Sequence, residues 1–338
     1  MNERIKKLRT RSLEAKPSIS AERARLLTEF YRRPETPALS APMQHARAFQ
    51  HVMERKTVVI DDGELIVGER GPAPKATPTY PEVCIHSLQD LQYLNDRKKT
   101  AFASDEETRR VYAEEIIPFW KGRSQRERIF AEMAPEWIDA YEAGIFTEFM
   151  EQRAPGHTVL GDKIYRQGLD DSKKEIEAAI AALDFMADPE AYDKREELRA
   201  MAVACDAVIA FARRHAAKAR ELAAAEKDAA RKKELERIAE VCERVPARVP
   251  RDFWEALQAY WFVHLGVITE YNTWDSFNPG RLDQHLWPFY EKGLQDGSLT
   301  KESARELLQA FWIKFNNQPA PPKVGVTAEE SGTYTDFA

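Results

Sequence analysis

The chain has 338 residues, and its 50 Lys and Arg against 56 Asp and Glu give a formal net charge of −6. This length can bury a sizeable core, enough for about two domains, and the 43% of hydrophobic residues argues against an intrinsically disordered chain. The slight acidity argues against a protein that wraps nucleic acid by bulk charge.

The first part of the chain predicts helices near residues 3–15, 20–33 and 41–55, where apolar positions recur every three or four residues. Residues 57–68 differ, because β-branched and apolar residues flank an Asp-Gly turn; they predict a hairpin or a strand–turn–strand. The Pro-rich stretch 71–81 predicts a surface loop without regular structure.

The middle of the chain is again helical in pattern from 86 to 143, with breaks at Pro118 and Pro135. Residues 144–170 show no clear period, and a loop this long inside a compact protein is usually functional or disordered. A long helical hairpin is predicted at approximately 188–244, where opposite charges recur at helical spacing. Without a sustained heptad repeat, a coiled coil or partner-binding helix is the weaker interpretation.

The last third begins with residues 251–270, which are apolar on every side and predict a buried helix. Asn278-Pro279 predicts the start of the next helix, and another helix is expected at 301–316. Residues 323–327 are a strand candidate. Together these elements predict an α/β protein that is predominantly helical.

The chain carries no signature of a phosphate-binding loop, a nucleophile elbow or a His-Glu-x-x-His zinc site, so no metal is predicted. The three cysteines are too dispersed for a disulfide framework. Cys205 and Cys242 are typical of small core residues, and Cys84 is the only one with a plausible exposed setting. The charged N-terminus and the short apolar runs predict a soluble, cytoplasmic protein without a membrane span.

Three polar segments contain the candidate functional residues. In the first, His157 follows a Pro-Gly turn and could donate to an anion or a hydroxyl group, although a structural histidine fits the spacing as well. Phe149, in the same segment, is typical of a core residue.

In the second segment, Asp275 could hold an ammonium group and Arg281 an acid, but ordinary turn hydrogen bonds also explain them. His285, one helical turn after Arg281, is more typical of a cap or a packing residue. In the third segment, Ser331 and the backbone amides around Gly332 could accept a carboxylate, with an ordinary turn as the alternative.

These segments resemble a known family when they are taken in order along the chain. Residues 62–69, 146–157 and 279–285 are similar to the N-terminal half of glycyl radical enzymes of the pyruvate formate-lyase-like group. The second stretch, with Trp274-Asp275 and residues 314–325, looks most like the dehydratases of this family that act on trans-4-hydroxy-L-proline.

The resemblance implies the N-terminal half of a β/α barrel, with residues 1–338 as an incomplete N-terminal domain. The family stores a radical on a backbone glycine, installed by a radical S-adenosylmethionine activating enzyme, and uses a cysteine thiyl radical to abstract hydrogen from the substrate. Neither the glycine nor the cysteine can be located in this chain, so we expect the glycyl radical domain to lie outside it. No separately bound cofactor is expected, and the full-length enzyme would be a homodimer.

Carried over residue by residue, the resemblance assigns the five candidates to hydroxyproline. It places Phe149 and Phe337 along the ring, His157 near the hydroxyl group, Asp275 at the amine and Ser331 at the carboxylate. This agrees with the chemistry of a ring-shaped zwitterion, which requires apolar walls, an anion and a set of donors. His157 and Asp275 are the candidate catalytic residues.

Two other interpretations remain open at this point. The chain could belong to another glycyl radical lyase, such as an isethionate lyase, a diol dehydratase or a hydroxyproline ring-opening enzyme. A sulfonate substrate would favour Arg or Gln near the anion, where this chain offers Ser331 and Asp275. The chain could also be a non-enzymatic helical binding or scaffold protein.

Overall fold

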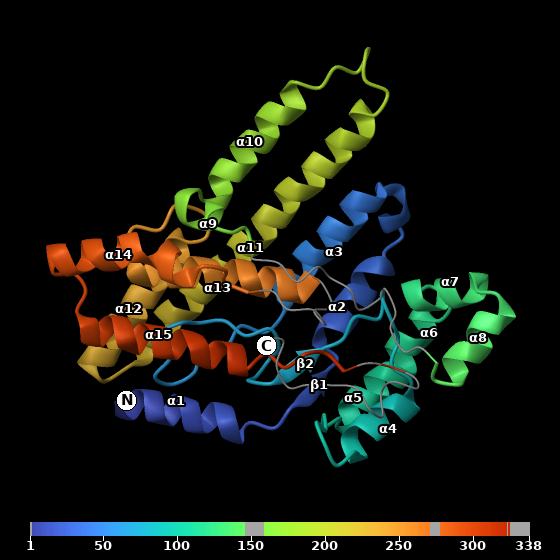
Figure 1. The fold of residues 1–338 in the computed structure, drawn as a ribbon, viewed down its shortest axis with the longest axis horizontal. Helices are drawn as coiled ribbons and strands as arrows, with labels where there is room; N and C mark the ends of the chain where they lie inside the picture. Colours follow the sequence, from blue (N-terminus) through green and yellow to red (C-terminus); the bar gives the residue numbers. More distant parts are fainter. Residues whose placement is uncertain (1, 146–158, 271–277, 323, 325–338) are drawn as a thin grey trace.

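The computed structural model describes residues 2–145, 159–270, 278–322 and 324. Within this part of the chain the fold is mostly helical, with one small parallel sheet of two strands (Figure 1). The predicted helix-dominated class is therefore confirmed.

The elements before residue 146 are α1 (Glu3–Glu14), β1 (Ser18–Ser20), α2 (Glu22–Tyr31), the 3-10 helix η1 (Thr36–Ala38), α3 (Ala41–Arg55), β2 (Ala76–Pro78), α4 (Leu88–Asp96), α5 (Glu106–Val111), the π-helix η2 (Tyr112–Ile116), α6 (Ile117–Trp120), α7 (Gln125–Glu132) and α8 (Pro135–Glu142). The later elements are α9 (Lys163–Arg166), α10 (Leu169–Ala181), α11 (Ala191–Ala225), α12 (Ala229–Arg244), α13 (Phe253–Glu270), α14 (Leu282–Asp296) and α15 (Lys301–Asn316). Proline opens α8, as its fixed φ favours at a helix start.

The core is built around α13, whose side chains are buried on every side as its apolar sequence predicts. Helices α11, α12 and α15 pack around it and share one hydrophobic cluster with it. A second, smaller cluster joins α2 to α4, α5 and η2. Figure 1 shows this second group, with α7 and α8, at one end of the molecule and the α13 core at the other.

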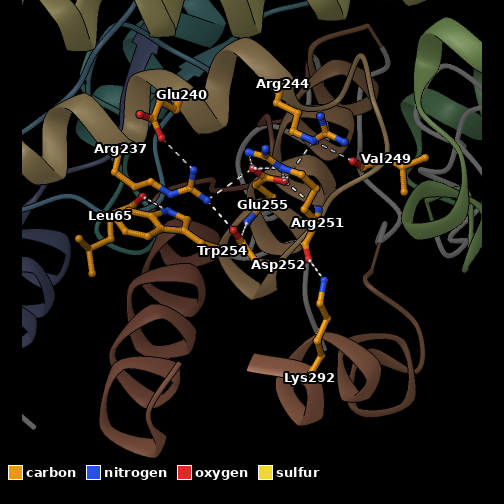
Figure 2. A network of polar contacts seen from close by, with 10 residues as sticks. All are labelled: Leu65, Arg237, Glu240, Arg244, Val249, Arg251, Asp252, Trp254, Glu255 and Lys292. Atoms are coloured by element: carbon orange, nitrogen blue, oxygen red, sulfur yellow. Dashed lines mark hydrogen bonds and ion pairs between the residues drawn. The ribbon is translucent and has the colours of Figure 1, made fainter. Parts of the chain in front are cut away.

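Residues 57–68 do not form the predicted hairpin. The turn is present, since the Glu64 amide donates to the Asp61 carbonyl at 3.2 Å, but no strand flanks it. Side chains of α13 take the place of a partner strand. Gln258 both donates to the carbonyl and accepts from the amide of Val67, each at 2.9 Å, and Trp254 donates to the Leu65 carbonyl (Figure 2).

The same pattern continues at Gly68, whose carbonyl accepts from the Trp261 indole at 2.9 Å. Gly68 has φ +112°, and a Cβ atom there would lie 2.7 Å from Leu265 Cδ1. The residue is therefore fixed as glycine by both its backbone conformation and its close approach to α13. Four backbone groups of residues 65–68 are thus bound by side chains of the helix, in the place that a second strand would take.

The Pro-rich stretch is also different from its prediction, because it contains β2. Strand β2 pairs in parallel with β1, with Ser18 opposite Ala76 and Ser20 opposite Pro78. Proline is tolerated here because it occupies the last position of a short strand in a two-stranded sheet. This sheet brings the start of α2 next to the residues that follow β2.

Helix α11 packs along α3, α10 and α12. Helices α11 and α12 fall within the predicted range 188–244. The first half of α11 and α10 project together from the body as an arm (Figure 1). None of the described helices is long and apolar enough to cross a membrane.

Candidate active site

All five residues predicted to bind or transform the substrate lie outside the described residues: Phe149, His157, Asp275, Ser331 and Phe337. What the structure describes is how the chain is held at the ends of the three segments that contain them. These ends are at Val159 for the first segment, at Glu270 and Asn278 for the second, and at the residues after α15 for the third.

The ends of the first and second segments lie side by side. The Val159 amide donates to the Asn278 carbonyl at 3.3 Å, which connects the backbone just after His157 with the backbone just after Asp275. Asn278 is itself held in a turn, since its side-chain oxygen accepts from the Gly280 amide at 2.8 Å. The residues that directly follow these two segments, which are distant in sequence, therefore lie next to each other.

Arg23, on α2, holds the other end of the second segment. Its Nε donates to the Thr269 carbonyl at 2.5 Å and its Nη2 to the Glu270 carbonyl at 3.1 Å, so it caps the last turn of α13. A cation at this position complements the negative end of the helix dipole. The same guanidinium binds Glu82 at 2.5 Å and stacks 4.0 Å from the centre of the Tyr80 ring.

Burial of Arg23 opposes its charge, but the Glu82 carboxylate outweighs this effect and raises the pKa of the guanidinium. The residue is only 5% exposed. Tyr80 adds a further contact to the same helix end, because its hydroxyl donates to the Ile268 carbonyl. Three consecutive carbonyls at the end of α13 thus have buried donors, which fixes where the chain leaves the helix.

A buried path continues from Arg23 to the third segment. Arg23 Nη1 donates to the Thr79 carbonyl at 3.1 Å, and the Tyr112 hydroxyl hydrogen-bonds the Thr79 hydroxyl. The Tyr112 ring contacts the His86 ring edge-on, and His86 Nε2 donates to the Pro322 carbonyl at 3.0 Å. Burial lowers the pKa of His86, so the neutral ring with its proton on Nε2 makes this bond.

The end of α15 is held by a second buried network, centred on Glu69. Lys314 donates to Glu69 at 2.6 Å and to Glu64 at 2.7 Å. Asn317 donates to Glu69 at 3.0 Å, and Gln318 hydrogen-bonds its other oxygen. The Glu69 carboxylate is thus satisfied by three side chains from one short stretch, which fixes the chain at the end of α15.

Comparisons with known proteins identify the family. The pyruvate formate lyase-like family model matches residues 1–338. The chain belongs to the pyruvate formate lyase-like family. It is 55% identical, over 99% of its length, to trans-4-hydroxy-L-proline dehydratase from Clostridioides difficile, and 38% identical, over 88%, to isethionate sulfite-lyase from Nitratidesulfovibrio vulgaris.

The fold agrees with that membership. The structure of the Clostridioides difficile hydroxyproline dehydratase with trans-4-hydroxy-L-proline bound covers the whole chain with a TM-score of 0.95 at 54% identity. This chain covers 43% of that structure and 42% and 37% of the two relatives. The chain thus corresponds to less than half of the length of these pyruvate formate lyase-like enzymes, as its resemblance to their N-terminal half predicts.

The cysteines of this family member do not resemble reactive thiols. Cys84 is buried, which corrects the exposed setting predicted for it: its amide donates to the Tyr80 carbonyl in the turn that follows Tyr80. Burial raises the pKa of Cys205 to about 11, and it raises the pKa of buried Cys242 further. Within the described ranges, no group of three or more His, Cys, Asp or Glu side chains is placed to hold a metal ion.

The structure describes two residues that were weighed as candidates in the second segment, Arg281 and His285. Arg281 is exposed at the start of α14 and lies 3.8 Å from Asp283. His285 packs against the Tyr165 ring, with ring centres 5.4 Å apart, as expected for a packing residue. Family membership, together with the homology to dehydratases, also argues against the non-enzymatic scaffold interpretation.

Sequence reasoning missed Arg23 and Glu82 as the residues that hold the end of α13. A signal was nevertheless present, since Arg23 shares one helix face with Leu27 and Phe30, and all three are buried. A basic residue on an apolar face and near a helix N-terminus, where its charge is unfavourable, indicates a buried partner.

A second contact at the end of α13 is expected to make stability depend on pH. His45 Nε2 lies 3.0 Å from Glu270 Oε1, and this hydrogen bond raises the pKa of His45 above 6.5. The raised pKa favours the folded state below the unfolded-state value, and this contribution is lost as the pH rises through the folded-state pKa. His45→Gln should therefore flatten the fall in melting temperature as the pH rises above about 6.5, the ordinary pKa of histidine.

Glu270→Gln tests the His45–Glu270 pair through its other member, because it removes the negative charge of the acceptor and keeps His45. It should flatten the pH dependence in the same way. An unchanged slope in both variants would show that this pair contributes nothing to the pH dependence.

Proposed function

We propose that this chain is part of a glycyl radical dehydratase that converts trans-4-hydroxy-L-proline to pyrroline-5-carboxylate. The observation that carries the proposal is the 55% identity, over 99% of the chain, to a trans-4-hydroxy-L-proline dehydratase. The isethionate sulfite-lyase from Nitratidesulfovibrio vulgaris is 38% identical over 88% of the chain. A pocket that must satisfy both a charged amine and a carboxylate constrains more side chains than an apolar pocket does, so high identity favours the same substrate class.

The proposed reaction removes one molecule of water and needs no net oxidant. The radical groups, which we expect outside this chain, would remove a hydrogen atom from the ring and later return it. The 4-hydroxyl group leaves with a proton as water, and the ring keeps one double bond. This chain would contribute the groups that bind and orient the amino acid.

The proposed roles follow the charges of the substrate. Asp275 would bind the ring ammonium, and Ser331 with nearby backbone amides would bind the carboxylate. His157 would hydrogen-bond the hydroxyl group, while Phe149 and Phe337 would form the apolar walls. The support for this arrangement is the match of one anion, one set of donors and two aromatic rings to a cyclic zwitterion.

The anchoring networks support these roles, because each holds the chain at the end of a segment that carries one of the proposed residues. Arg23 and Tyr80 bind the turn that precedes Asp275 by five to seven residues. Glu69 and His86 bind the stretch that precedes Ser331. Substrate-binding side chains must be held within a fraction of an ångström, and rigid supporting contacts are the usual means.

The proposed enzyme would need partners that this chain does not contain. A radical S-adenosylmethionine activating enzyme would install the glycyl radical on a C-terminal domain encoded outside residues 1–338. The full-length protein would be a cytoplasmic homodimer. Binding of hydroxyproline is recorded for the Clostridioides difficile enzyme, and its transfer to this protein is part of the proposal.

The decisive experiment is an anaerobic assay of the full-length protein with its activating enzyme. Glycyl radical content is measured by electron paramagnetic resonance, and trans-4-hydroxy-L-proline and isethionate are offered separately. We expect pyrroline-5-carboxylate from the first substrate and no sulfite from the second. A protein that carries the radical but forms no pyrroline-5-carboxylate would contradict the proposal.

Arg23 offers a test of the anchoring at α13. Arg23→Met should raise KM for trans-4-hydroxy-L-proline about tenfold, because the chain would leave α13 without its cap and misplace Asp275. Kinetic constants are measured per glycyl radical. Arg23→Lys, which keeps a cation and some of the hydrogen bonds, should recover part of the loss.

The double variant Arg23→Met/Glu82→Gln separates stability from positioning. It removes the uncompensated Glu82 charge, so it should be more stable than Arg23→Met alone. Its KM should nevertheless stay high, because the α13 carbonyls still lack their donor. A double variant with normal KM would show that Arg23 acts only through the charge of Glu82.

A further inference from the structure

An arginine-rich recess lies beside the N-terminal end of α13, where the end of α12 packs against α11. It has a volume of about 310 Å³. Its lining includes five arginines and two glutamates, five positive charges against two negative ones, in a chain whose net charge is −6. The arginines are Arg213, Arg220, Arg244, Arg248 and Arg251.

Two of these arginines are fixed by a buried carboxylate. Glu255 on α13 is 0% exposed, and it binds the Arg251 guanidinium at 2.6 Å and Arg244 Nε at 3.3 Å (Figure 2). Arg244 Nε also donates to the Val249 carbonyl at 3.1 Å. These two guanidinium groups are therefore held in place, and they lose little side-chain entropy on binding a ligand.

The other arginines differ in how they are neutralised. Arg220 pairs with Glu243 at 3.0 Å, and Glu240 is engaged by Arg237, which does not line the recess. Arg213 and Arg248 are exposed, and within the described part of the chain neither has a carboxylate partner. The recess thus holds two uncompensated guanidinium groups beside two that are fixed in place.

We propose that this recess binds a small polyanion that carries two adjacent phosphate groups. Guanidinium forks bind phosphate oxygens in pairs, and several of them around one concavity match a diphosphate better than a single carboxylate. The volume is at the lower end of the range for small-molecule sites. Free pyrophosphate and the diphosphate of a nucleotide share this chemistry.

The recess lies at the opposite end of α13 from Glu270, after which the segment with Asp275 begins. Glu255 and Glu270 are fifteen residues apart on α13, roughly 22 Å at the rise of an α-helix. Binding can therefore be measured on unactivated full-length protein, without any dehydratase activity. Failure of the proposed function would leave this test intact.

The test is isothermal titration calorimetry of the full-length protein with inorganic pyrophosphate and with ADP, at constant ionic strength. We expect saturable binding of at least one of them at one site per chain. Tighter binding of ADP would assign the site to a nucleotide, and equal binding would assign it to the free anion. Arg213→Gln/Arg248→Gln should weaken binding at least about tenfold.

The matched control is Arg9→Gln/Arg128→Gln, which removes two exposed arginines away from the recess and changes the net charge equally. It should leave the affinity within about twofold, because the contribution of distant charges is screened by salt. The proposal is overturned if wild-type protein shows no saturable heat with either ligand, or if the recess variant binds as tightly as wild type.

Discussion

Replacing Lys314 with methionine should destabilise the folded protein by about 3–5 kcal/mol, the usual cost of removing one partner of a buried ion pair. Lys314 is 2% exposed and is the shared cation of Glu64 and Glu69. Without it, two carboxylates would remain in the core with no opposite charge beside them. Urea unfolding of the full-length protein, followed by circular dichroism, measures the loss.

The loss should also depend on pH. Burial already raises the pKa of Glu64 in the wild type, where the Lys314 charge opposes this effect. In the variant that opposition is gone, so the folded-state pKa of Glu64 moves further up, and the stability is lost as pH rises through it. The destabilisation should therefore be smaller at about pH 5 than at about pH 8. At the lower pH a carboxyl group with a raised pKa keeps more of its proton, so less uncompensated charge is buried.

Lys301→Met is the matched control, because Lys301 is an exposed residue at the start of the same helix. It should change the free energy of unfolding by less than about 0.5 kcal/mol. An equally small change for Lys314→Met would show that the buried network does not depend on its cation.

Asp275→Asn is expected to weaken the use of trans-4-hydroxy-L-proline by about 30-fold or more in KM. This follows from the proposed pairing of Asp275 with the substrate ammonium, since loss of one partner of a desolvated charge pair costs about 2–5 kcal/mol. Asparagine keeps the size of the side chain, so the change tests charge. KM is measured anaerobically per glycyl radical.

Asp283→Asn removes a nearby acid that is exposed on α14 and serves as the control. It should leave KM unchanged. If Asp275→Asn carried a normal radical signal and a normal KM, the ammonium would have to be held by another residue, and the role assigned to Asp275 would be wrong.

The helices could be predicted from the sequence because their signals are local. The buried helix at 251–270 and the helix at 301–316 are found within two residues of the expected bounds. The hairpin at 57–68 failed because Gln258 and two tryptophans, nearly 200 residues later, bind backbone groups of residues 65–68 in place of a partner strand. No local pattern contains that information.

The candidate site, too, could be predicted only in part from the sequence. The five residues that would touch hydroxyproline were found through a family resemblance, and they stay predictions. The residues that hold their segments were not found, because Arg23, Glu82 and Glu69 act through partners far away in the sequence. Only the position of Arg23 on an apolar helix face gave a local indication of its role.

The way α13 binds residues 65–68 also bears on the solubility of the protein. An extended segment with unused amides and carbonyls is a template on which a strand from another molecule can add. Here the amide and carbonyl of Val67 and the carbonyls of Leu65 and Gly68 are occupied by side chains of one helix. Residues 65–68 have the composition of a strand. Because the side chains of Trp254, Gln258 and Trp261 occupy these four backbone groups, a strand from another molecule cannot pair with them.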